Sequence, residues 1–310
     1  MTEPVAVGIV FPRPECFRLD LASLIEEIGF DSVWVGEHVS FHVPMFDGLT
    51  TLAAIAARTQ RIRIGSAILL LPLRPPVPVA KAAAMVDVLS GGRLTLGVGV
   101  GGEFPKEFEA CGVPLTERGA RTDEGIAVLR KLWTEPRATF QGKFAQFSDL
   151  AMEPKPVQAG GPPIVIGGRS RAAMRRAARL GDGYMPYLFT PEQYAKAVTA
   201  IETEADAAGR SLTGFQYMLD QFILVDDDPS AAWSRANTYL SATYNQPFEK
   251  LIDRYCTVGP PEACVANLAR YREAGVRHFL FTPAAATREE FVRRAERIAK
   301  DLIPALKRNA

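Results

Sequence analysis

The sequence predicts one (β/α)8 barrel domain over residues 1–310, and three observations carry this prediction. Strand-like runs alternate with helix-like runs along almost the whole chain, which indicates parallel strands joined by helices. Eight such units can be counted. A chain of 310 residues is also long enough for a barrel of eight units. An open doubly wound sheet is the alternative, but it would require a longer intervening segment or a second domain.

The first four units occupy residues 5–135, and each starts with a short apolar run followed by apolar residues at helical spacing. Gly29 fits the C-cap of the first helix. We expect strands at 5–11, 31–36, 61–70 and 93–100, and helices at 19–30, 49–60, 77–92 and 121–135.

The second half begins with an insertion around residues 138–162. Two short alternating runs flank Gln141-Gly142, which predicts a hairpin over 138–150, and a Pro/Gly-rich surface loop follows. The alternation then resumes. We expect strands at 164–168, 182–187, 215–226 and 277–281, and helices at 170–181, 191–209, 229–242, 261–275 and 288–303.

Composition excludes several classes of function. With 36 basic and 35 acidic side chains the net charge is +1, so no overall field favours nucleic acid or an anionic membrane. The longest apolar run, 67–73, is too short to cross a bilayer, and the N-terminus has no signal-peptide pattern. Cys16, Cys111, Cys256 and Cys264 fit no zinc spacing, so we expect no metal site, reduced thiols and a cytoplasmic protein.

Gly97, Gly99 and Gly102 match the dinucleotide fingerprint G-x-G-x-x-G. That interpretation requires a helix to begin at the third glycine, whereas Glu103-Phe104-Pro105 follows here, and the match lies on the fourth strand instead of the first. We therefore expect these glycines to mark a strand end that a ligand or another backbone segment approaches closely.

A stronger anion-binding pattern follows the strand at 164–166. The residues Gly167-Gly168-Arg169-Ser170 lead directly into a helix, with Ser170 as a suitable N-cap and exposed glycine amides. Arg169 could add charge-assisted hydrogen bonds to an anion. The alternative is an ordinary strand-to-helix turn before a basic, solvated helix.

The stretch SVWVGEHVSFH, residues 32–42, begins as a buried strand and ends in polar side chains. Glu37 and His38 directly follow the apolar run, and His42 comes four residues later. In a barrel the carboxyl ends of the strands form the active face, so polar residues are expected there. The alternative for His38 is a structural histidine with satisfied hydrogen bonds.

Several of these segments together resemble the bacterial luciferase-like superfamily. The resemblance extends from about Val5 to Tyr187 and is densest in FDSVWVGEHV, TQRIRIGSAILLLPLRPPVPVAKAAAMVDVLSGGRLTLGVGVGGE, ERGARTDEGIAVLRKLWTE and PPIVIGGRSRAAMRRAARLGDGY. Within the superfamily the chain is most similar to the branch of oxidoreductases that depend on the deazaflavin coenzyme F420. The resemblance implies a (β/α)8 barrel with an insertion near the fourth strand, and a homodimer.

The resemblance also implies site residues. The family's Asp-His pair falls on Glu37 and His38, and its non-prolyl cis peptide falls on Ala67-Ile68, against one face of the coenzyme ring. The acid after the fourth-strand glycines falls on Glu103, and Gly101 is a candidate for binding the coenzyme. The coenzyme phosphate would contact Gly167, Gly168, Arg169 and Ser170.

These positions lead to a hypothesis about mechanism. His38 would bind the substrate oxygen and act as acid or base, and Glu37 would fix one end of the ring or orient His38. Glu103 is a second candidate for proton transfer. His42 and Phe11 are candidates for the substrate pocket, with Leu70 and Leu71 beside Phe11.

Three functions remain open from the sequence. The first is an F420-dependent oxidoreductase acting on a small organic alcohol, carbonyl compound or activated alkene. The second is an FMN-dependent monooxygenase that uses oxygen and a reductase partner. The third is a barrel that binds the coenzyme without catalysis. Nothing after residue 190 indicates a phosphorylated substrate.

Overall fold

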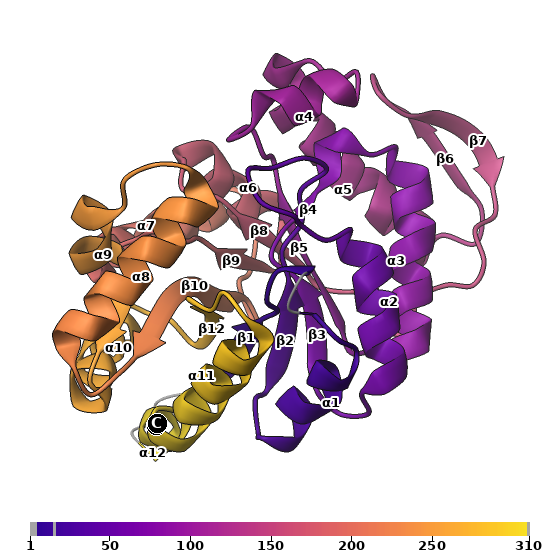
Figure 1. Cartoon of the computed structure of the whole chain (residues 1–310). Helices are drawn as coiled ribbons and strands as arrows, with labels where there is room; N and C mark the ends of the chain where they lie inside the picture. The colour runs from indigo at the N-terminus through magenta and orange to yellow at the C-terminus, as the bar shows by residue number, and fades with distance from the viewer. Residues whose placement is uncertain (1–4, 15–16, 309–310) are drawn as a thin grey trace.

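A closed barrel of eight parallel strands forms the centre of the molecule (Figure 1), as the sequence predicts. The computed structural model describes residues 5–14 and 17–308. Pairing of β9 with β10 and of β12 with β1 closes the ring. In spatial order the strands are β1 (Ala6–Val10), β2 (Ser32–Val35), β3 (Arg63–Ser66), β5 (Leu94–Gly99), β8 (Ile164–Gly167), β9 (Gly183–Met185), β10 (Gln216–Val225) and β12 (His278–Pro283).

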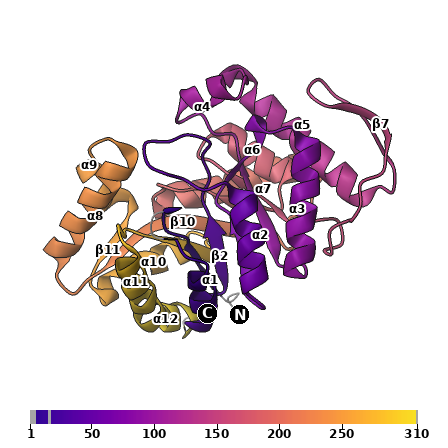
Figure 2. The ribbon, with the colours of Figure 1, turned by 45° about the vertical axis from the view of Figure 1, so that its right-hand side comes forward.

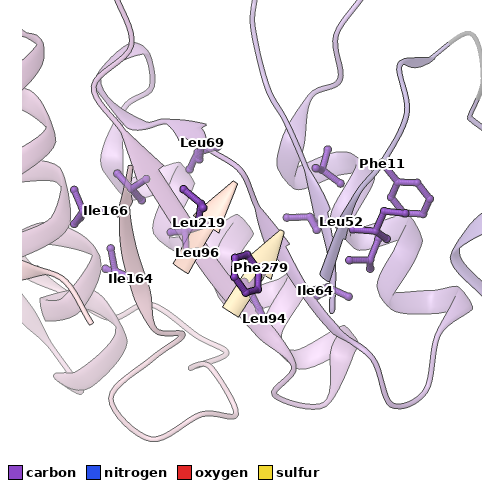
Figure 3. Close-up of a cluster of buried hydrophobic side chains, with 14 of the residues drawn as sticks. Phe11, Leu52, Ile64, Leu69, Leu94, Leu96, Ile164, Ile166, Leu219 and Phe279 are labelled. Carbon is purple, nitrogen blue, oxygen red and sulfur yellow. The ribbon is translucent and has the colours of Figure 1, made fainter. Parts of the chain in front are cut away.

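Helices cover the outside of the barrel and bury its outward-facing side chains. Figure 3 shows part of this outer core, in which Leu52 and Ile64 lie on the same side and Leu219 and Phe279 lie on neighbouring strands. The covering helices are α1 (Asp20–Glu27), α2 (Gly48–Arg58), α3 (Pro76–Ser90), α5 (Arg118–Thr134), α6 (Arg171–Leu180), α7 (Pro191–Ala207), α10 (Pro261–Glu273) and α11 (Arg288–Asp301).

Several elements are added to this plan, and the sequence predicted only the hairpin and α8. Strand β11 pairs with β10 beyond the point where β9 ends, so the segment between β10 and β12 is longer than a single crossover. The added elements are β4 (Leu69–Leu70), the 3-10 turns Leu71–Leu73 and Leu115–Glu117, α4 (Pro105–Ala110), the hairpin β6 (Ala138–Gln141) and β7 (Gln146–Leu150), α8 (Pro229–Tyr244), α9 (Glu249–Tyr255), β11 (Thr257–Gly259) and α12 (Ile303–Arg308).

The hairpin lies outside the ring of helices, beyond α5 (Figure 2). Glu124 on α5 accepts the backbone N–H groups of Lys143, Phe144 and Ala145 at 2.7–2.8 Å. One carboxylate thus satisfies three donors of the hairpin turn, which anchors the hairpin to the barrel.

The barrel interior is filled by side chains at alternate positions of the strands. Trp34 is buried there, and a Cβ atom on Gly65 would lie 2.3 Å from its ring, so glycine is needed for the indole to fit. Val10, Val165, Met185, Met218 and Leu280 complete this inner layer, with Ala67 and Ile68 packed against it. The interior is therefore a packed core, as expected for a barrel of this kind.

Local signals set the helix starts that matter for this face. Asp47 caps α2 by accepting the N–H of Thr50 at 3.0 Å, and Ser170 caps α6 by accepting that of Ala173 at 3.2 Å. Thr190 and Gln193 form a capping box at the start of α7. Each of these caps follows a barrel strand, so each fixes a helix N-terminus beside the mouth of the barrel.

The fourth-strand glycines do not open a nucleotide-binding helix. Gly97 and Gly99 lie within β5, while Gly101 and Gly102 adopt positive φ angles before α4 begins at Pro105. A Cβ atom on Gly97 would lie 2.0 Å from the carbonyl oxygen of Ser66, and one on Gly99 1.6 Å from the Ile68 side chain. The predicted close approach of another backbone segment is confirmed.

Two further features of the described residues concern membrane-spanning helices and disulfide bonds. None of the helices in residues 5–14 and 17–308 is long and apolar enough to span a bilayer. Cys111, Cys256 and Cys264 are free thiols, and Cys16 lies outside the described residues. Burial raises the pKa of Cys256 and of Cys264 to about 12, so both remain protonated at neutral pH.

Candidate active site

A cavity of about 400 Å³ opens at the carboxyl ends of the barrel strands. It brings together segments that are far apart in the sequence, including His38 and the turn at 167–170. The predicted site residues that line it are Glu37, His38, Ala67, Ile68, Gly101, Glu103, Gly167, Gly168, Arg169 and Ser170. The sequence analysis did not select Phe41, Met45, Tyr187, Asp220, Thr243 or Tyr244, which also line it.

His38 is held from the side of α4. Its Nδ1 atom lies 3.2 Å from both carboxylate oxygens of Glu107, a residue whose side chain is completely buried. Glu107 also accepts the backbone N–H of Val39, and Phe41 stacks on the imidazole with ring centroids 4.3 Å apart. Pairing with a carboxylate places the proton of neutral His38 on Nδ1, which leaves Nε2 to exchange a proton with a ligand.

Glu37 faces away from His38, which corrects the expectation that it orients the histidine. Neighbouring residues of an extended strand point to opposite sides, and Glu37 continues the outward series of Val33 and Val35. Its buried carboxylate accepts the N–H of Gly48 at 2.8 Å and that of Leu70 at 3.2 Å.

Arg74 completes the surroundings of Glu37, with its Nη2 atom 3.0 Å from the carboxylate. Arg74 also bonds Asp47, the N-cap of α2. Burial raises the pKa of Glu37, and Arg74 and the two amides oppose that shift. Glu37 therefore ties β2, α2 and β4 together, and its protein partners already occupy its oxygens.

Glu103 lies at the rim of the cavity. Its side chain is 46% exposed, accepts the hydroxyl of Tyr187 and lies 3.7 Å from Arg169. Arg169 in turn stacks over the Tyr187 ring at 4.8 Å. The carboxylate that pairs with His38 is Glu107, four residues along the chain, whereas Glu103 lines the cavity itself, and its role in proton transfer stays a prediction.

The Ala67–Ile68 peptide bond is cis, as the resemblance implied. It lies between β3 and β4, and the side chain of Ile68 extends over β5 and β8. A Cβ atom on Gly167 would approach Ile68 to 2.9 Å, so this glycine, like Gly99, leaves room for Ile68. The result is a smooth apolar surface at the floor of the cavity.

The turn at 167–170 has the features of an anion site. Gly168 has a φ of +125°, which an L side chain rarely adopts, and Ser170 caps α6. Amides at the start of α6 and the half-exposed guanidinium of Arg169 face the same cavity that His38 lines. This arrangement fits a molecule with a phosphate group at one end.

Comparison with known proteins places this site in a family. The family model described as luciferase-like monooxygenase matches residues 17–278. The chain belongs to the luciferase-like monooxygenase family. It is 29% identical to a protein of Nocardia farcinica named F420-dependent glucose-6-phosphate dehydrogenase, over 93% of each chain.

Solved structures agree with this family assignment. Monooxygenase RslO1 from Streptomyces bottropensis superposes with a TM-score of 0.84 at 28% identity, covering 96% of this chain and 99% of its own. An F420-dependent secondary alcohol dehydrogenase, solved with an F420-acetone adduct, superposes with a TM-score of 0.85 at 21% identity, over 98% of this chain and 99% of its own. At that identity the second likeness shows the fold alone.

Two predicted pocket residues lie elsewhere in this family member. Phe11 is buried in the outer core, against Phe17 at 5.2 Å and Phe291 at 6.4 Å, so the prediction that it lines the substrate pocket is wrong. The Phe11 side chain, directly after β1, points outward from the barrel and packs against Phe291 of α11. His42 lines a neighbouring hollow formed by residues 38–45, and its ring contacts those of Phe41 and Phe104.

The most informative residue that sequence reasoning missed is Glu107. Phe104 and Phe108 flank it at helical spacing, so Glu107 is an acid on the apolar side of a short helix. A carboxylate in that position is rarely buried without a partner, and this pattern could have identified it. Tyr244 and Asp220 follow residue 190, where the resemblance provides no motif.

Proposed function

We propose that this protein is an F420-dependent oxidoreductase that transfers a hydride between the deazaflavin and a small organic alcohol, carbonyl compound or activated alkene. The observation that carries the proposal is that one cavity contains both an anion-binding turn at 167–170 and the His38–Glu107 pair. The similarity to a protein named F420-dependent glucose-6-phosphate dehydrogenase supports the choice of coenzyme.

The residues present fit this coenzyme. Gly167, Gly168, Arg169 and Ser170 would hold its phosphate, and the surface at Ala67–Ile68 would support its ring. When bound, F420 supplies a ring carbon that accepts or releases a hydride. The protein supplies position and proton transfer.

His38 would move the accompanying proton. In alcohol oxidation, the hydroxyl proton passes to Nε2 as the carbon–hydrogen bond breaks and the carbonyl forms. Glu107 then stabilises the positive charge on the imidazole, and the reverse sequence protonates the oxygen when a carbonyl is reduced. Because Glu107 is buried, its charge acts on His38 with little screening by water.

An FMN-dependent monooxygenase with a reductase partner is the second candidate. It is favoured by the similarity to monooxygenase RslO1, which extends over nearly the whole of both chains. A barrel that binds F420 without catalysis is the third. The same turn and ring surface could hold FMN, so the test must compare the two coenzymes directly.

The test is a fluorescence titration of the purified protein with F420 and with FMN, followed by turnover assays with alcohols, ketones and activated alkenes. The proposal expects preferential binding of F420 and a change in its oxidation state with at least one substrate. Tight FMN binding without F420 affinity would favour the monooxygenase. Tight F420 binding without turnover of any compound would favour the non-catalytic barrel.

His38→Ala separates binding from chemistry. Turnover should fall about 10²- to 10⁴-fold, which is the usual contribution of acid–base catalysis, while F420 affinity changes little. His42→Ala is the matched control, because His42 lines the adjacent hollow. Equal losses in the two variants would contradict the role proposed for His38. The homodimer that the resemblance implies also stays a proposal, and light scattering on the eluted protein tests it.

A further inference from the structure

Asp220 places a carboxylate on the inner wall of the cavity. On β10 the side chains of Met218, Asp220 and Phe222 share one side, because residues two apart in a strand point the same way. Met218 belongs to the inner layer of the barrel, and Leu219 belongs to the outer core. Asp220 therefore occupies the next level above Met218, where the interior opens into the cavity.

This carboxylate has few partners. Among the described residues it accepts one side-chain hydrogen bond, from the hydroxyl of Thr282 at 2.7 Å, and no Lys or Arg pairs with it. An ionised carboxylate offers about four acceptor sites. Burial raises the pKa of Asp220 to about 6, so it is ionised at neutral pH while only partly hydrated. A ligand that donates a hydrogen bond would satisfy it.

Aromatic side chains surround the same part of the cavity. Tyr244, at the end of α8, lies 6.0 Å from Phe41 and 5.9 Å from Phe222, measured between ring centroids. Asp220 and Glu103 line the same cavity as this ring. Burial raises the pKa of the Tyr244 hydroxyl, and the charges of the two acids raise it further. An apolar molecular body could pack on these rings while a donor group reaches Asp220.

The charges that line the cavity oppose a phosphorylated substrate. Of the described lining residues, Arg169 is the one with a Lys or Arg side chain, and it lies at the anion-binding turn beside Glu103. Glu103 and Asp220 both contribute negative charge on the side of Tyr244. A substrate phosphate on that side would be repelled by these carboxylates, because phosphate binding requires positively charged or hydrogen-bond-donating groups.

We propose that Asp220 is a substrate-binding residue that selects a substrate without phosphate, whose apolar body packs on Phe41 and Tyr244 and whose hydroxyl or ammonium group donates to the carboxylate. The inference rests on the proposed function for the place of the coenzyme at 167–170. It separates this chain from the relative whose name specifies a sugar phosphate.

The experiment measures binding of four related probes to the full-length protein by titration calorimetry, with and without saturating F420. The probes are cyclohexanol, trans-1,2-cyclohexanediol, trans-2-aminocyclohexanol and cyclohexyl phosphate. The diol and the amino alcohol should bind about 10- to 100-fold more tightly than cyclohexanol, as expected for a hydrogen bond to a charged group. With F420 filling the turn at 167–170, cyclohexyl phosphate should bind most weakly.

Asp220→Asn should abolish the advantage of the amino alcohol and reduce that of the diol, which distinguishes an ammonium donor from a hydroxyl donor. Asp226→Asn is the matched control on the same segment: Asp226 follows β10, pairs with Arg235, and does not line the cavity. It should leave the order of the probes unchanged.

Three results would overturn the inference: tighter binding of cyclohexyl phosphate than of cyclohexanol when F420 fills the turn at 167–170, an unchanged order in Asp220→Asn, or no preference for the diol and the amino alcohol over cyclohexanol in the unmodified protein. Failure of the proposed function has a different signature: F420 would not bind, or it would bind without turnover of any compound. The probe order measured without coenzyme tests Asp220 in that case as well.

Discussion

The acidic residues on the two sides of the cavity differ in burial and in the number of their hydrogen-bond partners. On the side of β2 and α4, Glu37 and Glu107 are buried and fully occupied by amides, Arg74 and His38. On the other side, Glu103, from the loop between β5 and α4, reaches Tyr187 and is half-exposed, and Asp220 on β10 accepts one hydroxyl hydrogen bond among the described residues. We call these the partnered side and the open side.

The difference separates scaffold from ligand surface. A buried carboxylate whose acceptors are filled by the protein fixes local geometry and has little left for a substrate. A carboxylate whose oxygens lack hydrogen-bond donors in a cavity reduces the stability of the folded protein, and it gains a partner only when a ligand binds. The partnered side therefore orients His38, and the open side is expected to select the substrate.

Glu107→Gln should have the largest effect. The amide keeps the shape of Glu107 but cannot stabilise a positively charged His38, so turnover should fall about 10²- to 10⁴-fold. Steady-state kinetics over a range of pH, with F420 affinity measured in parallel, checks this. Glu109→Gln, an exposed residue on the same helix, is the control. A loss below tenfold for Glu107→Gln would remove the distinction between the two sides.

Glu37→Ala should mainly affect folding. It leaves Arg74 and the amides of Gly48 and Leu70 without their acceptor, and breaking a buried ion pair typically destabilises a protein by about 3 kcal/mol or more. Urea unfolding measures the change. Asp47→Ala removes a helix cap and should lose about 1 kcal/mol. If the two variants are equally stable, the contacts of Glu37 contribute no more to stability than a helix cap does, which contradicts the structural role given to Glu37.

Asp220→Asn should raise the stability of the folded protein, whereas Glu37→Ala lowers it. The pKa of Asp220 is about 6 in the folded protein against 3.8 for an ordinary aspartate, so the folded state binds more protons between those values. The stability of the unmodified protein therefore decreases as pH rises through that window. The asparagine variant should be more stable by about 1–3 kcal/mol above pH 6, and the difference should vanish below pH 4.

Thermal unfolding at pH 3.5, 5 and 7.5, chosen as roughly below, within and above that window, checks this prediction. A variant that is less stable than the unmodified protein at the highest pH would mean that the charged carboxylate stabilises the fold through Thr282. Asp220 would then belong with the scaffold.

Glu103→Gln should have the smallest effect on stability. Its carboxylate is 46% exposed, and ion pairs at such positions are worth less than about 1 kcal/mol. Urea unfolding should place the variant within that range. A loss as large as that of Glu37→Ala would show that the rim contacts of Tyr187 and Arg169 are structural.

Periodicity and capping signals predicted the barrel and most of its strands, because these are local features of the chain. The turn at 167–170 was predictable for the same reason: two glycines and a capping serine occur in sequence between a strand and a helix. The polar end of the second strand pointed to His38, and the resemblance added its expected role and the cis peptide at Ala67–Ile68, which no local pattern specifies.

The partners of these residues were not predictable, since they depend on how distant elements pack. Glu37 and His38 are adjacent, and only the strand geometry shows that one faces Arg74 and the other Glu107. Asp220 lies in an apolar strand far from every motif, and its role depends on the barrel register that places it above Met218. Phe11 was misplaced for a related reason, because an apolar strand end does not reveal which side it faces.

A crystal structure of the protein with bound F420 tests the central claim most directly. The account predicts the phosphate within hydrogen-bonding distance of the amides and side chains at 167–170, the ring against Ala67–Ile68, and its reactive edge facing Nε2 of His38. A coenzyme bound outside the cavity, or a ring whose reactive edge faces away from His38, would contradict it.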